Sequence, residues 1–219
     1  MIGPLKGWYE LCGHIVDGHN KIIDRRAIAW SLLSYKRQET HKKTLIVNIS
    51  DYYNYSNYTA WASIPEDEVV ILDTNQNLLS AIMSLCETEE FGQVLIENLG
   101  FLLGSGQLVK DGKLLPIGKL LGDISFLFKL VQLAESLNML FVTTSHIVSM
   151  MRKDIHLGGN LLSESCYNNR WEVKRKGYLH NAGLITGNVY TIENLQTPEE
   201  CVVMKHRFLC GPCEIQKTK

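Results

Sequence analysis

The chain has 219 residues, of which 45% are hydrophobic, and its formal net charge is −1. This length and composition predict a single globular domain over residues 1–219. No apolar run approaches the roughly 18 residues that a membrane-spanning helix needs, and the first residues lack the apolar core of a signal peptide. The six cysteines are dispersed, which argues against a secreted disulfide framework. We therefore expect a soluble, intracellular protein.

Helical and strand patterns alternate along the chain. Helices are predicted where apolar residues recur every three or four positions, and strands where short apolar, β-branched runs occur. Asp24 is the predicted N-cap of the first helix. In chain order the sequence predicts an apolar stretch 8–12, a helix 25–38, a strand 44–49, an aromatic segment 52–61, a strand 69–72, a helix 77–86, a strand 93–98, a helix 120–137, a strand 139–144, and short strands 170–175, 189–193 and 201–208. This order predicts an α/β fold, with a mainly parallel central sheet flanked by helices and an antiparallel C-terminal β flank.

Charge is unevenly distributed. Residues 44–109 contain no lysine or arginine but nine acidic residues, whereas the other segments together sum to +8, which gives the net charge of −1. One interpretation is chance clustering on a solvated face. The other is a bipolar molecule, with one face for an anionic polymer and one for a basic partner protein.

The segment GHIVDGHN, residues 13–20, has the spacing of a phosphate-binding loop but not its chemistry. Such a loop reads G-x-x-x-x-G-K-[ST], whereas this chain has Gly13 and Gly18 followed by His19 and Asn20. Asp17 adds a negative charge, which would repel a phosphate oxygen ~4–5 Å away by roughly 3–4 kcal/mol at an effective dielectric of about 20. The loop is therefore interpreted as the relic of a nucleotide site. The alternative is that the two glycines serve only a tight strand-to-helix turn.

Four stretches resemble motifs of the RecA-like recombinase family, in particular the eukaryotic strand-exchange recombinase and its paralogues. Residues 8–20 resemble the strand and loop of Walker A, and VLIEN at 94–98 resembles the Walker B strand. FVTTSHI at 141–147 resembles the strand that ends in the family's polar sensor tripeptide, and residues 158–160 with 169–177 resemble the end of the second DNA-binding loop and the next strand. The resemblance spans nearly the whole ATPase core and implies a RecA-like domain without the family's separate N-terminal domain.

The departures from the family pattern bear on catalysis. Besides His19 and Asn20, the Walker B acid is Glu97 where Asp is usual, and the family's general base falls on Ser50, with Asp51 one residue away. Because each missing group does electrostatic or positioning work in phosphoryl transfer, we expect no catalytic residues and no hydrolysis. No cofactor is expected, although weak ATP binding without turnover stays open.

In this family, two loops beyond the strands contact single-stranded DNA. By resemblance the first is 104–118 and the second 147–160. Glycines with interspersed cations suit a loop that follows a phosphate backbone. The alternative is ordinary solvated surface residues. The candidate DNA-binding residues are Lys110, Lys113, Lys119, Arg152, Lys153 and His156, with Lys174, Arg175 and Lys176 as an extension.

Two further patterns allow more than one interpretation. Cys201, His206, Cys210 and Cys213 are four residues of zinc-binding type at short spacing, but a strand over 202–204 would point the first two to opposite faces. We favour a tight Gly-Pro turn in a terminal hairpin. The aromatic segment 52–61 is interpreted as a core edge or an interface, and its acidic flank is assigned to a protein partner.

The resemblance implies a non-catalytic recombinase paralogue in the nucleus, acting in homologous recombination repair. It would be a subunit of a mediator complex that pairs with another RecA-like subunit, binds single-stranded DNA and assists recombinase filament assembly. One alternative is an active DNA-dependent ATPase in which Lys21 takes the lysine's role. Another is a structural RecA-like subunit of an Elongator-type tRNA-modification complex.

Overall fold

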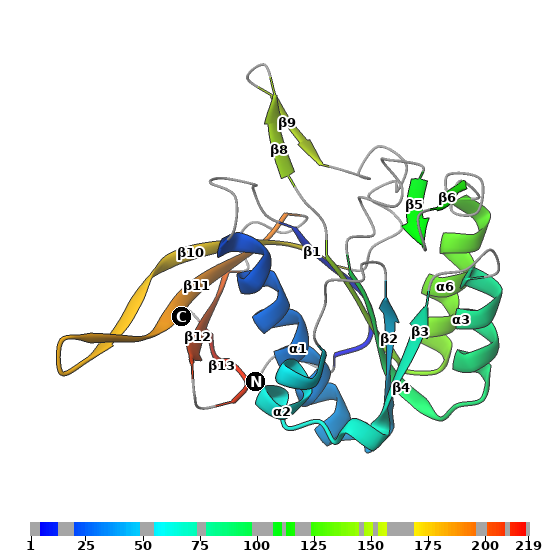
Figure 1. The fold of residues 1–219 in the computed structure, drawn as a ribbon, viewed down its shortest axis with the longest axis horizontal. Coiled ribbons are helices and arrows are strands. Elements are labelled where there is room, and N and C mark those ends of the chain that lie inside the picture. Colours follow the sequence, from blue (N-terminus) through cyan, green and yellow to red (C-terminus); the bar gives the residue numbers. More distant parts are fainter. Residues whose placement is uncertain are drawn as a thin grey trace.

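The structure is a computed structural model, which describes residues 5–12, 20–48, 55–73, 78–97, 107–110, 113–116, 124–144, 147–150, 153–156, 169–195, 201–208 and 211–217. Its central element is a nine-stranded sheet in the order β13-β12-β11-β10-β1-β7-β4-β2-β3 (Figure 1). The strands are β1 (Gly7–Cys12), β2 (Lys43–Asn48), β3 (Val69–Asp73), β4 (Phe91–Ile96), β7 (Leu140–Thr144), β10 (Asn169–Asn181), β11 (Leu184–Asn194), β12 (Cys201–Arg207) and β13 (Glu214–Lys217).

The sheet is parallel from β10 through β1, β7, β4 and β2 to β3, and antiparallel from β10 to β13. This confirms the predicted α/β architecture with a mainly parallel sheet and an antiparallel C-terminal flank. Helices α1 (Asn20–Thr40) and α2 (Tyr55–Ala62) cover one face, while α3 (Leu78–Glu87) and α6 (Ile124–Ser136) cover the other (Figure 1). A short 3₁₀ turn, η1 (Glu66–Glu68), precedes β3.

Alternating side chains of the parallel strands feed two hydrophobic clusters, one on each face. Trp8, Val47 and Phe141 belong to the cluster beneath α3 and α6. Leu11 and Ile46 belong to the cluster beneath α1, which also contains the fully buried Trp30. Because both faces are covered, the strands read as continuous apolar runs, and this is why the sequence revealed them.

One local prediction is wrong, and one helix was not predicted. The first helix begins at Asn20 rather than at Arg25, so Asp24 lies inside α1 and is not its N-cap. The apolar stripe used for prediction starts at Ala27, although Ile22 and Ile23 already precede it in the helix. The aromatic segment contains a helix, α2, whose Tyr55, Thr59 and Ala62 are buried at helical spacing. Aromatic residues are only average helix formers, so their clustering hid this short helix.

Three hairpins complete the described chain. The predicted loop 104–118 contains β5 (Gln107–Lys110) and β6 (Lys113–Pro116), and the predicted loop 147–160 contains β8 (Ile147–Met150) and β9 (Lys153–His156). The predicted terminal hairpin is confirmed as the antiparallel pair β12–β13. None of the described helices is both long and apolar enough to cross a bilayer.

Candidate functional site at the carboxyl edge of the sheet

The carboxyl ends of the parallel strands define the edge where ligands bind in open α/β sheets. Strands β1, β7, β4 and β2 end there, and α1 begins there. Of the predicted nucleotide loop, Gly13, Gly18 and His19 lie outside the described residues, and the backbone of Asn20 opens α1.

Glu97, which directly follows β4, forms a buried ion pair with Arg26 of α1. Arg26 Nε lies 2.8 Å from Glu97 Oε1 and 3.2 Å from Oε2, so one N–H donor is shared between both carboxylate oxygens. The side chains of Arg26 and Glu97 are only 18% and 5% exposed. The Walker B-like carboxylate is therefore already bound to a cation supplied by the protein.

Burial and charge act in opposite directions on this carboxylate. Burial raises the pKa of Glu97, and the guanidinium groups of Arg26 and then Arg25 counteract part of that rise. Arg25 is itself buried. Two arginines from one helical turn thus place positive charge beside the carboxylate, in the region where the family resemblance would place Mg²⁺.

An aromatic groove opens beside this ion pair, between α1, α2 and β12. The cavity has a volume of about 380 Å³, which falls in the range of small-ligand pockets. Burial raises the pKa of the Tyr58 hydroxyl while Arg26 opposes the rise, which connects this wall of the groove to the Arg26–Glu97 pair. The lining residues are Ala27, Asn57, Tyr58, Trp61, His206 and Phe208.

Ring contacts fix the walls of the groove. Tyr58 stacks on Trp30 at a centroid distance of 5.9 Å, and His206 lies edge-on to Trp61 at 4.9 Å and to Phe208 at 5.6 Å. Trp61 Nε1 is buried and has no hydrogen-bond acceptor among the described residues. The groove can therefore accept a flat or apolar group.

The C-terminal hairpin reaches the groove because it is tied to α1. The Cys213 backbone N–H donates to Ser31 Oγ at 2.9 Å, and the Tyr35 hydroxyl donates to the Cys213 carbonyl at 2.6 Å. Sequence analysis identified the aromatic segment but not this groove. Its partners on β12 are more than 140 residues later, and no local pattern reports such a contact.

Four of the predicted DNA contacts, Lys110, Lys113, Lys153 and His156, lie on two hairpins at the carboxyl edge. Figure 1 shows β5–β6 and β8–β9 on the side toward which the parallel strands point. Lys110 pairs with Lys113, and Met150 with Lys153, in each case as the last pair before the connection; Lys153 is thus at the far end of β8–β9, and His156 opposite Ile147 at its base. Lys119 and Arg152 lie outside the described residues.

The structure does not bring the remaining candidates, Lys174, Arg175 and Lys176, together with these hairpins. Lys174 Nζ lies 2.8 Å from a Glu193 oxygen and 3.1 Å from a Glu172 oxygen, and the hydrogen bond to Glu193 is the main cause that raises the pKa of this lysine. Arg175 lies 5.7 Å over the ring of Tyr178, and Lys176 is exposed. These residues are on β10, which curves away from both hairpins (Figure 1).

The zinc candidates do not converge in the part of the chain that the structure describes. Strand β12 pairs regularly with β11 from Cys201 to Arg207, which puts Cys201 and His206 on opposite faces. Cys213 is buried with its Sγ 3.9 Å from the Ala27 carbonyl, and Cys210 lies outside the described residues. Among the described residues, no three His, Cys, Asp or Glu side chains are grouped to hold a metal.

A scan against protein-family models finds no matching family, and a search of curated proteins finds no matching relative.

Proposed function

We propose that this chain is a non-catalytic RecA-like recombinase paralogue that acts in homologous recombination repair in the nucleus. It serves as a subunit of a mediator complex, pairs with another RecA-like subunit, binds single-stranded DNA and assists recombinase filament assembly. The four stretches that carry the family resemblance fall on β1 with the start of α1, on β4, on β7 and on β10. The parallel order β10-β1-β7-β4 makes their strands neighbours in the middle of the sheet, which supports the proposal.

The observation that carries the proposal is the Arg26–Glu97 ion pair. In an active site the carboxylate after this strand must accept hydrogen bonds from the Mg²⁺ hydration shell or bind the ion itself. Here both carboxylate oxygens already accept from Arg26 Nε. A divalent ion placed beside this guanidinium would be repelled, since like charges ~4 Å apart repel by about 4 kcal/mol per unit charge product at an effective dielectric of 20.

ATP turnover by the purified chain tests the non-catalytic half of the proposal. We expect no Mg²⁺-dependent hydrolysis, and no change on Lys21→Ala. A control variant, Arg26→Gln, keeps a neutral hydrogen-bond donor beside Glu97 but removes the charge. Hydrolysis by the wild-type chain that is lost in Lys21→Ala would overturn the proposal and favour the active ATPase.

The DNA-binding part of the proposal assigns the contact with single-stranded DNA to the hairpins β5–β6 and β8–β9. With only about four cations in play, binding should be modest and strongly dependent on salt. We expect Lys110→Ala/Lys113→Ala/Arg152→Ala/Lys153→Ala to weaken binding of an oligothymidine and to reduce the slope of log K against log salt by up to about 3, since each phosphate contact on a single strand contributes about 0.7.

A charge-matched control separates a specific surface from net charge. The variant Lys6→Ala/Lys42→Ala/Lys129→Ala/Lys205→Ala removes four cations from other parts of the described chain. It should leave the salt slope close to that of the wild-type chain. Equal loss in both quadruple variants, or in neither, would show that the two hairpins are not the DNA-binding surface.

The mediator role has its own readout. Recombinase filament formation on single-stranded DNA, followed by fluorescence with and without this chain, should be accelerated by the wild-type chain and not by the hairpin variant. Acceleration that persists in that variant would separate mediator activity from DNA binding.

A further inference from the structure

The hairpin of β10 and β11 continues beyond the sheet as an arm, defined here as residues 175–186. Strand β10 pairs with β1 only as far as Glu172, and β11 pairs with β12 only from Gly187 onward. The two arm strands are joined by Ala182 and Gly183, both at positive φ, which is the backbone of a tight turn that matches the twist of a hairpin. In Figure 1 the arm reaches out at one end of the molecule.

The arm exposes apolar side chains that its own chain does not cover. Leu184 is 71% exposed, Ile185 51% and Tyr178 49%, and these are three of the six large apolar side chains exposed in the described part of the chain. The same segment contains Arg175 and Lys176 but no acidic residue. An arm that is apolar near its tip and cationic at its base fits a surface that is hollow, apolar and acidic.

The chain itself presents such a surface, which we call the acceptor groove. It is a shallow hollow of about 190 Å³ between α2 and β3, lined by Tyr55, Ser56, Thr59, Glu66, Val69 and Ile71. Ile71 is 49% exposed, and among the described strands β3 has a neighbour on one side only. Glu66 lines the hollow, the next residue, Asp67, is exposed, and the region 44–109 that contains them has no lysine or arginine.

The arm and the groove of one molecule cannot meet. Four strands separate β10 from β3 in the sheet, and the arm curves away from β3 (Figure 1). A contact between them must therefore join two copies. We propose that the arm of one copy docks in the acceptor groove of a second copy, with Ile185 against Ile71 and with Lys176, on the same face of the arm, facing Glu66 and Asp67. Such a contact uses different surfaces on the two copies and leads to open or ring-shaped assemblies.

A protein surface suits the arm better than nucleic acid. Leu184 and Ile185 are aliphatic, whereas contacts to single-stranded bases rely on aromatic stacking and on many cations. Of the cations at the arm, Arg175 lies over Tyr178 and Lys174, just before the arm, is held by two carboxylates. The inference does not depend on the proposed function: Lys176 was also a predicted DNA contact, but Leu184 and Ile185, which the test changes, were not.

Sedimentation velocity over about 1–200 µM tests the contact. The wild-type chain should associate in a concentration-dependent way. An arm variant, Leu184→Ser/Ile185→Ser, and a groove variant, Glu66→Lys/Ile71→Ser, should each raise the dissociation constant more than about tenfold, since a central apolar contact is lost in both. Leu195→Ser, which removes an exposed apolar side chain outside both surfaces, is the matched control and should behave as the wild type.

Mixing the two variants gives the sharpest outcome. The arm variant keeps an intact groove and the groove variant keeps an intact arm, so an equimolar mixture should form a complex that stops at two chains. A monomeric wild-type chain over the whole range would overturn the inference, as would a mixture that stays monomeric. Loss of oligothymidine binding in the arm variant, with the wild type monomeric, would instead assign the arm to nucleic acid.

Discussion

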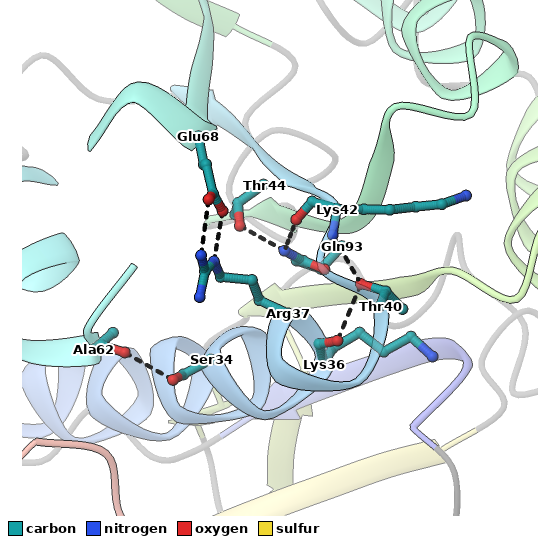
Figure 2. A network of polar contacts seen from close by, with 9 residues as sticks. All are labelled: Ser34, Lys36, Arg37, Thr40, Lys42, Thr44, Ala62, Glu68 and Gln93. Carbon is teal, nitrogen blue, oxygen red and sulfur yellow. Dashed lines mark hydrogen bonds and ion pairs between the residues drawn. The ribbon is translucent and has the colours of Figure 1, made fainter. Parts of the chain in front are cut away.

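At the amino edge and at the carboxyl edge of the parallel strands, an arginine of α1 pairs with a glutamate from another element, but the two pairs lie in different surroundings. At the amino edge Arg37 binds Glu68 through two nitrogens, at 2.5 and 2.8 Å, and both side chains are partly exposed (Figure 2). At the carboxyl edge Arg26 binds Glu97 through one nitrogen, in a nearly buried site. The first carboxylate has its pKa lowered by the hydrogen bond to Arg37, and the second has its pKa raised by burial.

Further hydrogen bonds join α1 to the neighbouring strands at the amino edge. At the amino edge Gln93 Nε2 donates to the Lys42 carbonyl at 3.0 Å and to Thr44 Oγ1 at 2.7 Å, and the Thr40 hydroxyl closes the end of α1 on the Lys36 carbonyl (Figure 2). The Gln93 side-chain oxygen, by contrast, is buried without a hydrogen-bond partner among the described residues. The amino edge thus fastens helix to strand through these hydrogen bonds and a partly exposed ion pair, whereas the ion pair at the carboxyl edge is nearly buried.

The largest expected change in stability comes from removing one partner of the buried Arg26–Glu97 pair. Arg26→Met leaves the Glu97 carboxylate buried without its main cation, and removing one partner of a buried pair costs about 3–5 kcal/mol of unfolding free energy. Arg37→Met, at the partly exposed pair, should cost no more than about 1 kcal/mol. Urea denaturation at pH 7 measures both.

A double variant supplies the control. Arg26→Met/Glu97→Leu removes both charges, and apolar replacement of a whole buried pair is often neutral or stabilising. The double variant should therefore be more stable than Arg26→Met alone. Equal stability of the single and double variants would show that the lost packing of the arginine, and not the unpaired carboxylate, accounts for the effect.

The hydrogen bonds of Gln93 are expected to matter less. Gln93→Leu leaves the Lys42 carbonyl and the Thr44 hydroxyl without this donor, which should cost about 1–3 kcal/mol. Gln132→Leu, at an exposed position of α6, is the matched control and should stay within about 0.5 kcal/mol of the wild type. A loss as large as that of Arg26→Met would mean that the two edges do not differ in the way described.

Sequence patterns revealed the sheet because its evidence is local. Strands such as β2, β4 and β7 are buried on both faces and read as apolar runs wherever they occur. Their spatial order, and the register that places Glu10 opposite Arg170 on neighbouring strands, depend on crossovers that no short window contains. The fold class was therefore predictable and the strand order was not.

The candidate site was predictable only in part, for the same reason. The family resemblance pointed to Glu97, but its partner Arg26 comes 71 residues earlier in the chain. The apolar pattern that predicts the helix around Arg26 does not indicate which charged residue that arginine will contact. The aromatic groove needed both α2, whose helical character the aromatic cluster hid, and His206 from β12. Long-range side-chain pairs, not element types, are what the sequence left undetermined.

The smallest expected effect concerns pH: the contributions of Glu68 and Glu97 to the stability of the fold should change in opposite directions as the pH falls. The folded pKa of Glu68 is lowered, so its charged form adds stability above the unfolded value near 4.3, and this is lost as pH falls through the folded pKa. The folded pKa of Glu97 is raised, so its charge opposes folding at neutral pH, and this penalty disappears as pH falls toward 4.3. Between pH 7 and about 4, the unfolding free energy of the wild type should fall by at most about 1 kcal/mol relative to that of Glu68→Gln. Over the same pH range, it should rise relative to that of Glu97→Gln. Urea titrations of the three chains at both pH values measure these differences, and two differences of the same sign would mean that Arg26 outweighs burial at Glu97.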